Sequence, residues 1–237
     1  MKYMGSKSRL AKHILPIILK DRGDGFYVEP FAGGMNIIDK VDGKRIANDV
    51  NIYLVDMWKA LTDGWIPSEY SREEYIHIRD NKNTYPNHLV GYAGFCLSYC
   101  GKWFGGYAGI TNTRDGIRDY QKEAKNNILK QVKQMKGVVF SNTDYWEMNI
   151  PSGSTVYCDP PYAGTTEYKD SGFNHSLFWK WVREISEDNR VFVSEYNAPE
   201  DFRCVWQKEV ASSLSANGSS GGNKKSIEKL FVIGEIK

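Results

Sequence analysis

Apolar residues recur with two different periods along this chain, and the two periods predict helices that alternate with short strands. Helical spacing over 10–18 is followed by an apolar triplet at 26–28, which is typical of a short buried strand. We then expect a glycine turn with a helix through 37–41, a second strand at 45–47 and a helix over 52–61. This order of elements predicts an α/β fold built on a doubly wound sheet.

The segment 65–120 interrupts this alternation. Its run 101–109 is rich in glycine and aromatic residues, and it does not fit a central strand. We interpret 65–120 as a small, mostly helical inserted subdomain. The main domain is then expected to consist of 1–64 and 121–237.

The alternating pattern resumes after the insertion. The expected elements are a helix near 119–135, strands at 138–140 and 154–158, a helix over 175–185, a strand at 191–193, and two antiparallel strands at 205–210 and 230–236. The expected fold is therefore a Rossmann-like doubly wound sheet that ends in a C-terminal antiparallel hairpin.

Composition narrows the class of protein without choosing a function. The chain has 237 residues, of which 41% are hydrophobic and 25% charged, as in globular proteins. Its net charge of +2 neither requires nor excludes nucleic acid, since a local basic face can bind phosphate. No segment has the pattern of a signal peptide or a membrane span. We therefore expect a cytoplasmic protein without a membrane partner, either a monomer or a weak dimer.

The four cysteines show neither disulfide spacing nor the spacing of a zinc site; they are Cys96, Cys100, Cys158 and Cys204. Cys96 and Cys100 could share one helix face, but further metal ligands are missing nearby. We therefore expect buried, reduced thiols in a reducing compartment and no bound metal.

The sharpest chemical signal is the run Asp159-Pro160-Pro161-Tyr162, which follows the strand expected at 154–158. The two prolines donate no backbone hydrogen bonds, so acceptors and an aromatic ring stand together at a strand end. Asp159 and the Pro160 carbonyl can accept from an amino group on a planar ring, while an exposed Tyr162 stacks on the ring face. This arrangement predicts chemistry on the amine of a ring.

A second signal is the run 29–34, Glu-Pro-Phe-Ala-Gly-Gly, which follows the first strand. Glycines there let the backbone approach a ligand, and a helix beginning at the turn would point amide groups at it. Asp49 follows the second strand, where an acid accepts hydrogen bonds from ribose hydroxyls. The three-glycine pyrophosphate fingerprint is missing, which favours S-adenosylmethionine, a cofactor without phosphate, over a dinucleotide.

Together these segments resemble the signature motifs of the S-adenosylmethionine-dependent methyltransferases that act on DNA adenine, the Dam-like D12 class. The glycine turn precedes the insertion and the Asp159 motif follows it, as in the alpha group of that family. The similarity extends from Tyr3 to Ser194-Glu195-Tyr196 and looks closest to phage and prophage enzymes. It implies a site-specific enzyme that methylates adenine N6 in double-stranded DNA by base flipping, with 65–120 recognising the target.

The resemblance also implies roles for particular residues. The catalytic residues are expected to be Asp159, Pro160 and Tyr162. The residues expected to hold the cofactor are Tyr3, Lys7, Phe31, Gly33, Asp49, Asp144, Tyr145 and Asp159. Cations and stacking groups suit phosphate and base contacts, and the DNA-binding candidates are Tyr99, Lys102, Trp103, Arg114, Arg118 and Tyr168. The insertion does not cleanly show the Arg-Asn hairpin of Dam-type enzymes that recognise GATC, so that target is not carried over.

Other functions stay open. N4-cytosine methylation poses the same chemical problem, since its acceptor is also an amine on a ring. A catalytically silent DNA-binding regulator would keep the insertion and lose turnover, although intact Asp49, Asp159 and Tyr162 argue against it. Methylation of the cytosine ring would need an activated thiolate, and no Pro-Cys nucleophile loop occurs in the sequence.

Overall fold

The computed structural model describes residues 1–114, 116–162, 172–211 and 225–234 of the chain. The chain forms two compact units. One consists of Met1–Ala11 and Phe31–Met148, and the other of Lys12–Pro30 and Asn149–Lys237. Each unit therefore combines two stretches that are distant in the sequence.

The first unit joins a pair of parallel strands to a group of helices. Its elements are β2 (Arg45–Asn48), α2 (Ile52–Thr62), α3 (Arg72–Asp80), α4 (Asn87–Gly91), β3 (Ile110–Thr113), β4 (Gly116–Asp119), α5 (Tyr120–Val132) and β5 (Val138–Ser141). β2 and β5 are parallel, and β3 and β4 form a separate antiparallel hairpin. Asn51 begins α2 and Asp119 begins α5, because each side chain accepts a backbone hydrogen bond from the first turn.

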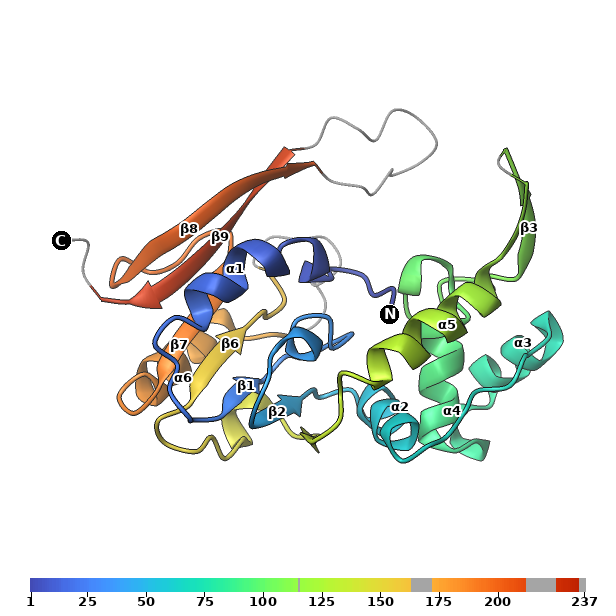
Figure 1. Cartoon of the computed structure of the whole chain (residues 1–237), viewed down its shortest axis with the longest axis horizontal. Coiled ribbons are helices and arrows are strands. Elements are labelled where there is room, and N and C mark those ends of the chain that lie inside the picture. The colour runs from blue at the N-terminus through green and yellow to red at the C-terminus, as the bar shows by residue number, and fades with distance from the viewer. Residues whose placement is uncertain (115, 163–171, 212–224, 235–237) are drawn as a thin grey trace. The chain divides into compact units, whose positions relative to one another are not determined.

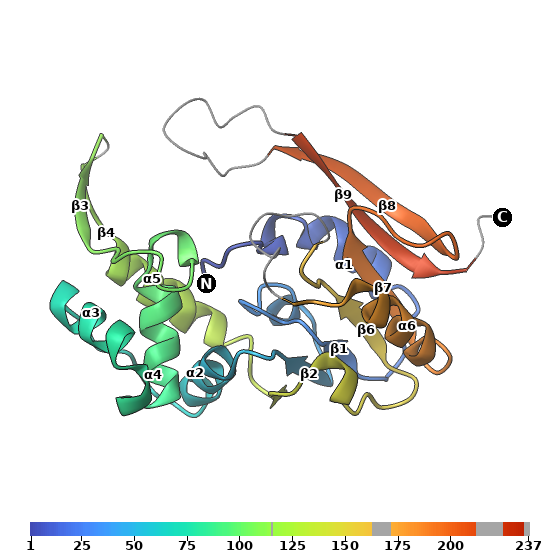
Figure 2. The same cartoon turned by 180° about the vertical axis from the view of Figure 1, so that it is seen from behind.

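The expected insertion, 65–120, lies within the first unit, and its helical elements are α3, α4 and short 3₁₀ and π-helical turns, which together make up less than half of it. The β3–β4 hairpin, which extends from the start of α5 (Figure 2), is not among the elements expected from the sequence. Its strands are short and largely exposed, so they lack the apolar alternation of a half-buried strand. The Asp115-Gly116 pair is the remaining hairpin signal. The limits of the inserted subdomain stay a prediction.

Aromatic rings pack the glycine-rich run 101–109. The Trp103 ring centroid lies 4.7 Å from that of Phe95 and 4.7 Å from that of Phe104. A Cβ atom at Gly94 would collide with the Trp103 ring, so glycine at that position allows the close approach. The contacts of Trp103 with Phe95, Phe104 and Gly94 therefore hold this run in place.

The second unit contains most of the main sheet. Its elements are α1 (Ala11–Ile18, from Lys12 onward), β1 (Tyr27–Glu29), β6 (Thr155–Cys158), α6 (His175–Ile185), β7 (Arg190–Glu195), β8 (Phe202–Ala211) and β9 (Lys225–Ile233). β6 lies parallel to β1 on one side and to β7 on the other, and β9 is antiparallel to both β7 and β8. Figure 1 shows β8 and β9 as a long hairpin with α1 beside it. The His13 ring of α1 stacks on Trp206 of β8 at 6.2 Å between centroids.

The seven strands of the main sheet follow the order β5-β2-β1-β6-β7-β9-β8. This order confirms the expected α/β sheet, which is mostly parallel and ends in an antiparallel hairpin. One expected element is wrong: the helix through 37–41 is a single 3₁₀ turn, Ile38–Lys40. The backbone becomes extended at Val41 (φ −109°, ψ 132°), which ends the turn, and the described residues that directly follow the glycine turn form no α-helix whose amide groups could point at it.

The structure also bears on the expectation that the cysteines are buried, reduced thiols. All four cysteines are free thiols; Cys96 and Cys158 are buried, whereas Cys100 and Cys204 are exposed. The expectation of buried thiols is therefore wrong for Cys100, on a 3₁₀ turn, and Cys204, on β8.

Across the described residues, no helix combines the length and apolar character needed to cross a membrane. The same residues contain no group of three His, Cys, Asp or Glu side chains placed to hold a metal ion.

Candidate active site

Three acidic residues stand at the carboxyl ends of neighbouring parallel strands in the second unit. Glu29 ends β1, Asp159 follows β6, and Glu195 ends β7. Because β6 pairs in parallel with both β1 and β7, the three residues lie along one edge of the sheet. Glu29 is 3% exposed and Glu195 is 2% exposed. The carboxyl edge of such a sheet is where α/β proteins bind ligands, so this edge is a candidate reaction site.

Burial and the acids change the ionisation of two neighbouring side chains on β6. Burial first, and then the charge of Asp159, raise the pKa of both Tyr157 and Cys158 well above their ordinary values. The Cys158 thiol therefore keeps its proton and is a poor nucleophile. This agrees with the sequence argument against chemistry through a cysteine thiolate.

Tyr162 is buried, which corrects the expectation of an exposed ring. Only 8% of it is exposed. Its hydroxyl donates to Glu228 Oε2 of β9 at 2.9 Å, and its ring meets Tyr196 edge-on with centroids 4.7 Å apart. Burial, followed by the charges of Asp159 and Glu228, raises the pKa of Tyr162, so the hydroxyl remains a donor. A sequence motif alone could not show that the sheet's last hairpin reaches this tyrosine.

In the first unit, Asp49 organises the glycine turn. Its Oδ2 accepts from Gly33 N at 2.9 Å, and its Oδ1 accepts from Asn51 N at 2.9 Å. Ala32 N donates to the Asn48 carbonyl at 2.8 Å, which ties the turn to the end of β2. Desolvation raises the pKa of Asp49, although the two amide donors oppose the rise. The carboxylate thus links the turn to the start of α2.

Tyr3 lies over this turn. A Cβ atom at Gly33 would come within 2.8 Å of the Tyr3 ring, and one at Gly34 within 2.6 Å of Tyr3 Cβ. Gly33 also has a positive φ of 50°, which disfavours other residues. The Tyr3 ring in turn contacts Phe95, with centroids 5.5 Å apart. Tyr3, Gly33 and Asp49, expected from the sequence to share one site, therefore lie together.

The remaining cofactor candidates of this unit are Phe31, Asp144, Tyr145 and Lys7. The Phe31 ring contacts that of buried Tyr145, with centroids 5.1 Å apart. Asp144 precedes the 3₁₀ turn Tyr145–Glu147. Lys7 Nζ donates to the Gly5 carbonyl at 3.4 Å, within its own segment. The roles of these residues toward a cofactor stay predictions.

The DNA-binding candidates occupy different surroundings. Tyr99 is 60% exposed, and Lys102 and Arg114 are exposed. Trp103 is half-buried within its aromatic cluster. Arg118 donates to Glu123 Oε2 at 2.8 Å. Tyr168 lies outside the described residues.

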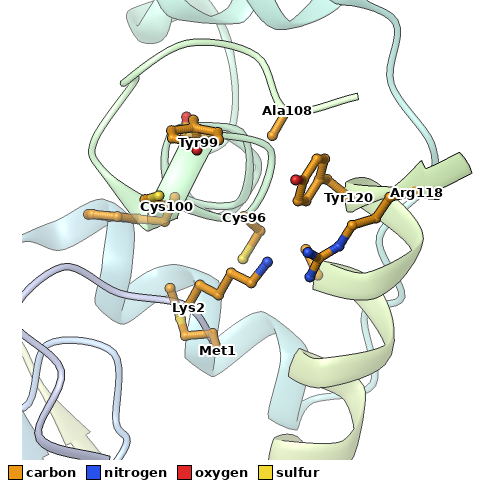
Figure 3. A pocket seen from close by; sticks show the side chains of 11 residues that line it. Met1, Lys2, Cys96, Tyr99, Cys100, Ala108, Arg118 and Tyr120 are labelled. Atoms are coloured by element: carbon orange, nitrogen blue, oxygen red, sulfur yellow. The ribbon is translucent and has the colours of Figure 1, made fainter. Parts of the chain in front are cut away.

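One pocket of about 210 Å³ lies beside these candidates in the first unit. Tyr99, Arg118 and Tyr120 line it, and so does Lys2. Figure 3 shows the Lys2 and Arg118 side chains pointing toward each other beside Tyr120. Lys2 Nζ also lies 3.5 Å from the carboxylate of Glu123, the partner of Arg118. Glu123 therefore balances both cations at this pocket.

Residues 3–181 of this chain match the model of a protein family that is described as "D12 class N6 adenine-specific DNA methyltransferase". This span includes the glycine turn, the insertion and the Asp159 motif. The chain belongs to this family. The D12-class assignment confirms the resemblance drawn from the motifs.

Two curated proteins that are similar to this chain are named as a methylase and a methyltransferase. The chain is 28% identical over 208 residues to modification methylase StsI of Streptococcus sanguinis, covering 78% of this chain and 32% of that protein. It is 24% identical over 208 residues to type II methyltransferase M.FokI of Planomicrobium okeanokoites, with the same coverage of 78% and 32%. The D12-class chain thus spans about a third of the length of these relatives.

Solved structures show weaker likeness to the D12-class chain. TrmN from Thermus thermophilus matches with a TM-score of 0.43 at 12% identity, over 95% of this chain and 48% of that one. A putative RNA methyltransferase from Pyrococcus horikoshii matches with a TM-score of 0.46 at 10% identity, over 98% and 86%. At such scores the structural matches add nothing to the family assignment.

Some residues that build the D12-class site carry no sequence signal. Gln131 Nε2, from α5, donates to the Gly34 carbonyl at 3.2 Å and the Met35 carbonyl at 2.9 Å. Asn48 Oδ1 accepts from Thr143 N at 3.1 Å and so joins the ends of β2 and β5. Glu228 reaches Tyr162 across 66 positions of sequence. The buried Glu29 and Glu195 could have been found, because an acid directly at a strand's end in an α/β chain is a positional signal.

Proposed function

We propose that this chain transfers a methyl group from S-adenosylmethionine to the N6 amine of adenine at a fixed site in double-stranded DNA. The observation that carries the proposal is the Asp159-Pro160-Pro161-Tyr162 run at the carboxyl end of β6, inside the span that matches the adenine-specific family. Buried acids on both neighbouring strands support a reaction site at this edge.

The chemical task is to make a poor nucleophile react. The lone pair of an adenine amine is delocalised into the ring. Asp159 and the Pro160 carbonyl accept hydrogen bonds from the amine, which localises the lone pair on nitrogen and fixes its direction. Asp159 need not be a strong base, because the proton can leave after the methyl group has been transferred.

Residues of the first unit suit S-adenosylmethionine, which supplies an electrophilic methyl group on sulfur when bound. The glycine turn lets Tyr3, a cofactor candidate, pack directly on the backbone, since a Cβ atom at Gly33 or Gly34 would fill the space that Tyr3 occupies. In this assignment Asp49 accepts hydrogen bonds from the ribose hydroxyls of the cofactor. The rings of Phe31 and Tyr145 pack against the adenine ring of the cofactor. The sequence of the turn lacks the three-glycine pyrophosphate fingerprint, which agrees with a ligand that carries no phosphate.

Changing Gly34 to Ala is expected to weaken S-adenosylmethionine binding about tenfold, the equivalent of about 1.4 kcal/mol. The new methyl group would lie 2.6 Å from Tyr3 Cβ and displace the residue that covers the turn. Isothermal titration calorimetry with S-adenosylhomocysteine measures the effect. Tyr3→Gly, which removes the Cβ atom that the new methyl group would meet, and the double variant provide the control. If Tyr3 is the group displaced, the two changes together cost no more than the larger single loss.

The target adenine must leave the duplex to reach Asp159, and extruding a base costs a few kcal/mol. In this proposal Tyr162 offers a ring face to the extruded base, and such stacking returns about 1–3 kcal/mol. The ring is already buried beside Asp159 and held at its hydroxyl. A fixed ring spends little conformational entropy when it accepts the base.

The β3–β4 hairpin suits target recognition. Its exposed residues include Ile110 and Ile117, 71% and 78% exposed, with Arg114 at the turn. A two-stranded ribbon fits the major groove of B-DNA, where side chains can read base edges. Exposed apolar groups beside a cation are what contacts with base methyl groups and phosphates require. We assign the hairpin and the exposed Lys102 to DNA.

Changing both Lys102 and Arg114 to Ala is expected to weaken DNA binding and to flatten its dependence on salt. The slope of log K against log salt falls by about 0.9 for each phosphate that the protein no longer neutralises. Fluorescence anisotropy at several salt concentrations measures both quantities. Lys180→Ala, a change of an exposed cation on α6, serves as the control. Wild-type affinity and slope in the double variant would mean that other residues bind the DNA.

The direct test is to incubate the protein with labelled S-adenosylmethionine and unmethylated genomic DNA, then to identify the methylated nucleosides by mass spectrometry. N6-methyladenine in one sequence context supports the proposal. N4-methylcytosine would keep the amine chemistry and change the base. Bound cofactor and bound DNA without any product would favour the catalytically silent regulator.

A further inference from the structure

Tyr162 is held from two sides by residues of the second unit that lie far from it in the sequence. Glu228, on β9, accepts from its hydroxyl at 2.9 Å. Tyr196, just beyond β7, meets its ring at an interplanar angle of 83°. The hydroxyl is the end of the side chain farthest from the backbone, so these contacts restrict rotation of the ring about both side-chain bonds.

The hairpin that carries Glu228 has little freedom of its own. β9 pairs with β7 through Val193↔Phe231, Ser194↔Leu230 and Glu195↔Lys229. Leu230, two residues from Glu228, is fully buried. The sheet therefore fixes where the Glu228 carboxylate stands relative to the ends of β6 and β7. A support of this kind, on a regular element, holds a functional side chain more accurately than a loop can.

The hydrogen bond is also of the strong kind. A carboxylate that accepts from a phenol makes a charge-assisted bond, which is roughly twice as strong as a neutral one. The phenol remains protonated because burial raises the pKa of Tyr162. In the register of the β8–β9 hairpin, Glu228 pairs with Lys208 of β8, so a positively charged residue is its neighbour on the adjacent strand.

We propose that Glu228 is a positioning residue for methyl transfer: it holds the Tyr162 ring in the plane in which the ring stacks on the extruded base. This inference rests on the proposed function, since it needs a base at Asp159. Glu228 acts on the base through Tyr162, whose hydroxyl it holds. The C-terminal hairpin is then part of the catalytic apparatus.

The first test compares single-turnover methylation by the wild type, E228A, E228Q and Y162F. We expect E228A to slow methyl transfer about tenfold or more, the effect of losing a hydrogen bond to a charged group. Affinity for the cofactor and for DNA should change little, so the loss appears in kcat rather than in KM. E228Q keeps an acceptor and should restore most of the rate. E209A, a change of an exposed acid on the neighbouring strand β8, should behave as wild type.

The second test separates positioning from general stability. Y162F keeps the ring and removes the donor, so it should match E228A, and the double variant should be no slower than either. A fluorescent adenine analogue at the mapped target reports stacking, and its emission should be less quenched in E228A and Y162F than in the wild type. A merely structural role would leave the emission of the bound complex unchanged.

The outcomes keep the two proposals apart. If the wild type methylates DNA and E228A does so at the same rate, Glu228 has no positioning role and the proposed function stands. Additive losses in the double variant would also overturn the role, because the two residues would then act independently. If the wild type methylates no DNA, the proposed function itself fails. Should E228A not fold, E228Q and Y162F still decide the question.

Discussion

Replacing Asp159 by alanine is expected to lower the rate of methyl transfer by on the order of 10²- to 10³-fold, the usual cost of removing one preorganised polar group from a reaction site. Asp159 follows β6 at the carboxyl edge of the sheet, with strands on both sides. Its carboxylate is the charged acceptor available to the amine in our assignment. Alanine leaves the backbone acceptor at Pro160, which explains why some activity should remain.

The measurement is single-turnover incorporation of labelled methyl groups into DNA that contains the mapped site. Circular dichroism and cofactor affinity check that D159A keeps its fold and its cofactor site. D188A provides a matched control, because Asp188 is an exposed acid of the same unit. Methylation by D159A at the wild-type rate would refute the mechanism.

Replacing Asp49 by alanine is expected to weaken S-adenosylmethionine binding about 10- to 100-fold, from the loss of hydrogen bonds to a charged group. Two causes combine. The carboxylate is the predicted acceptor for the ribose hydroxyls, and it also holds the Gly33 and Asn51 amides at 2.9 Å. D49N can still accept a hydrogen bond from one amide, so we expect it to lose less affinity than D49A.

Cofactor affinity should also depend on pH through Asp49. Desolvation raises the pKa of Asp49, so protonation in the free protein begins at a higher pH than in an ordinary aspartate. Binding that needs the carboxylate is complete above this raised pKa and weakens as the pH falls through it. Calorimetric titrations at several pH values should show this fall for the wild type and a flatter profile for D49N. Equal profiles for both proteins would mean that another group titrates.

Several elements were predictable because their signals are local. The helix expected over 175–185 is α6, His175–Ile185, and its apolar face buries Phe178, Trp179, Trp181 and Val182. Helical spacing acts within a few turns, so tertiary context was not needed to find it. The strand before Asp159 and the acid after the second strand were also visible in sequence, because buried strands are apolar and their ends are marked by polar residues.

Other elements were not predictable for equally physical reasons. The hairpin β3–β4 is largely exposed and carries no apolar alternation. The helix expected through 37–41 is only the 3₁₀ turn Ile38–Lys40, because the backbone becomes extended at Val41. Apolar spacing shows which residues could face a core from a helix, but it does not show where the backbone leaves the helical conformation.

The sequence by itself determined the family, the α/β order of elements and the identity of the motif residues, because these depend on residue type and spacing along the chain. The tertiary structure decided which distant groups support those residues. Gln131 of α5 holds the turn at Gly34, and Glu228 of β9 holds Tyr162. Such contacts depend on strand register and helix placement, which follow from the packing of the whole sheet and not from any local pattern.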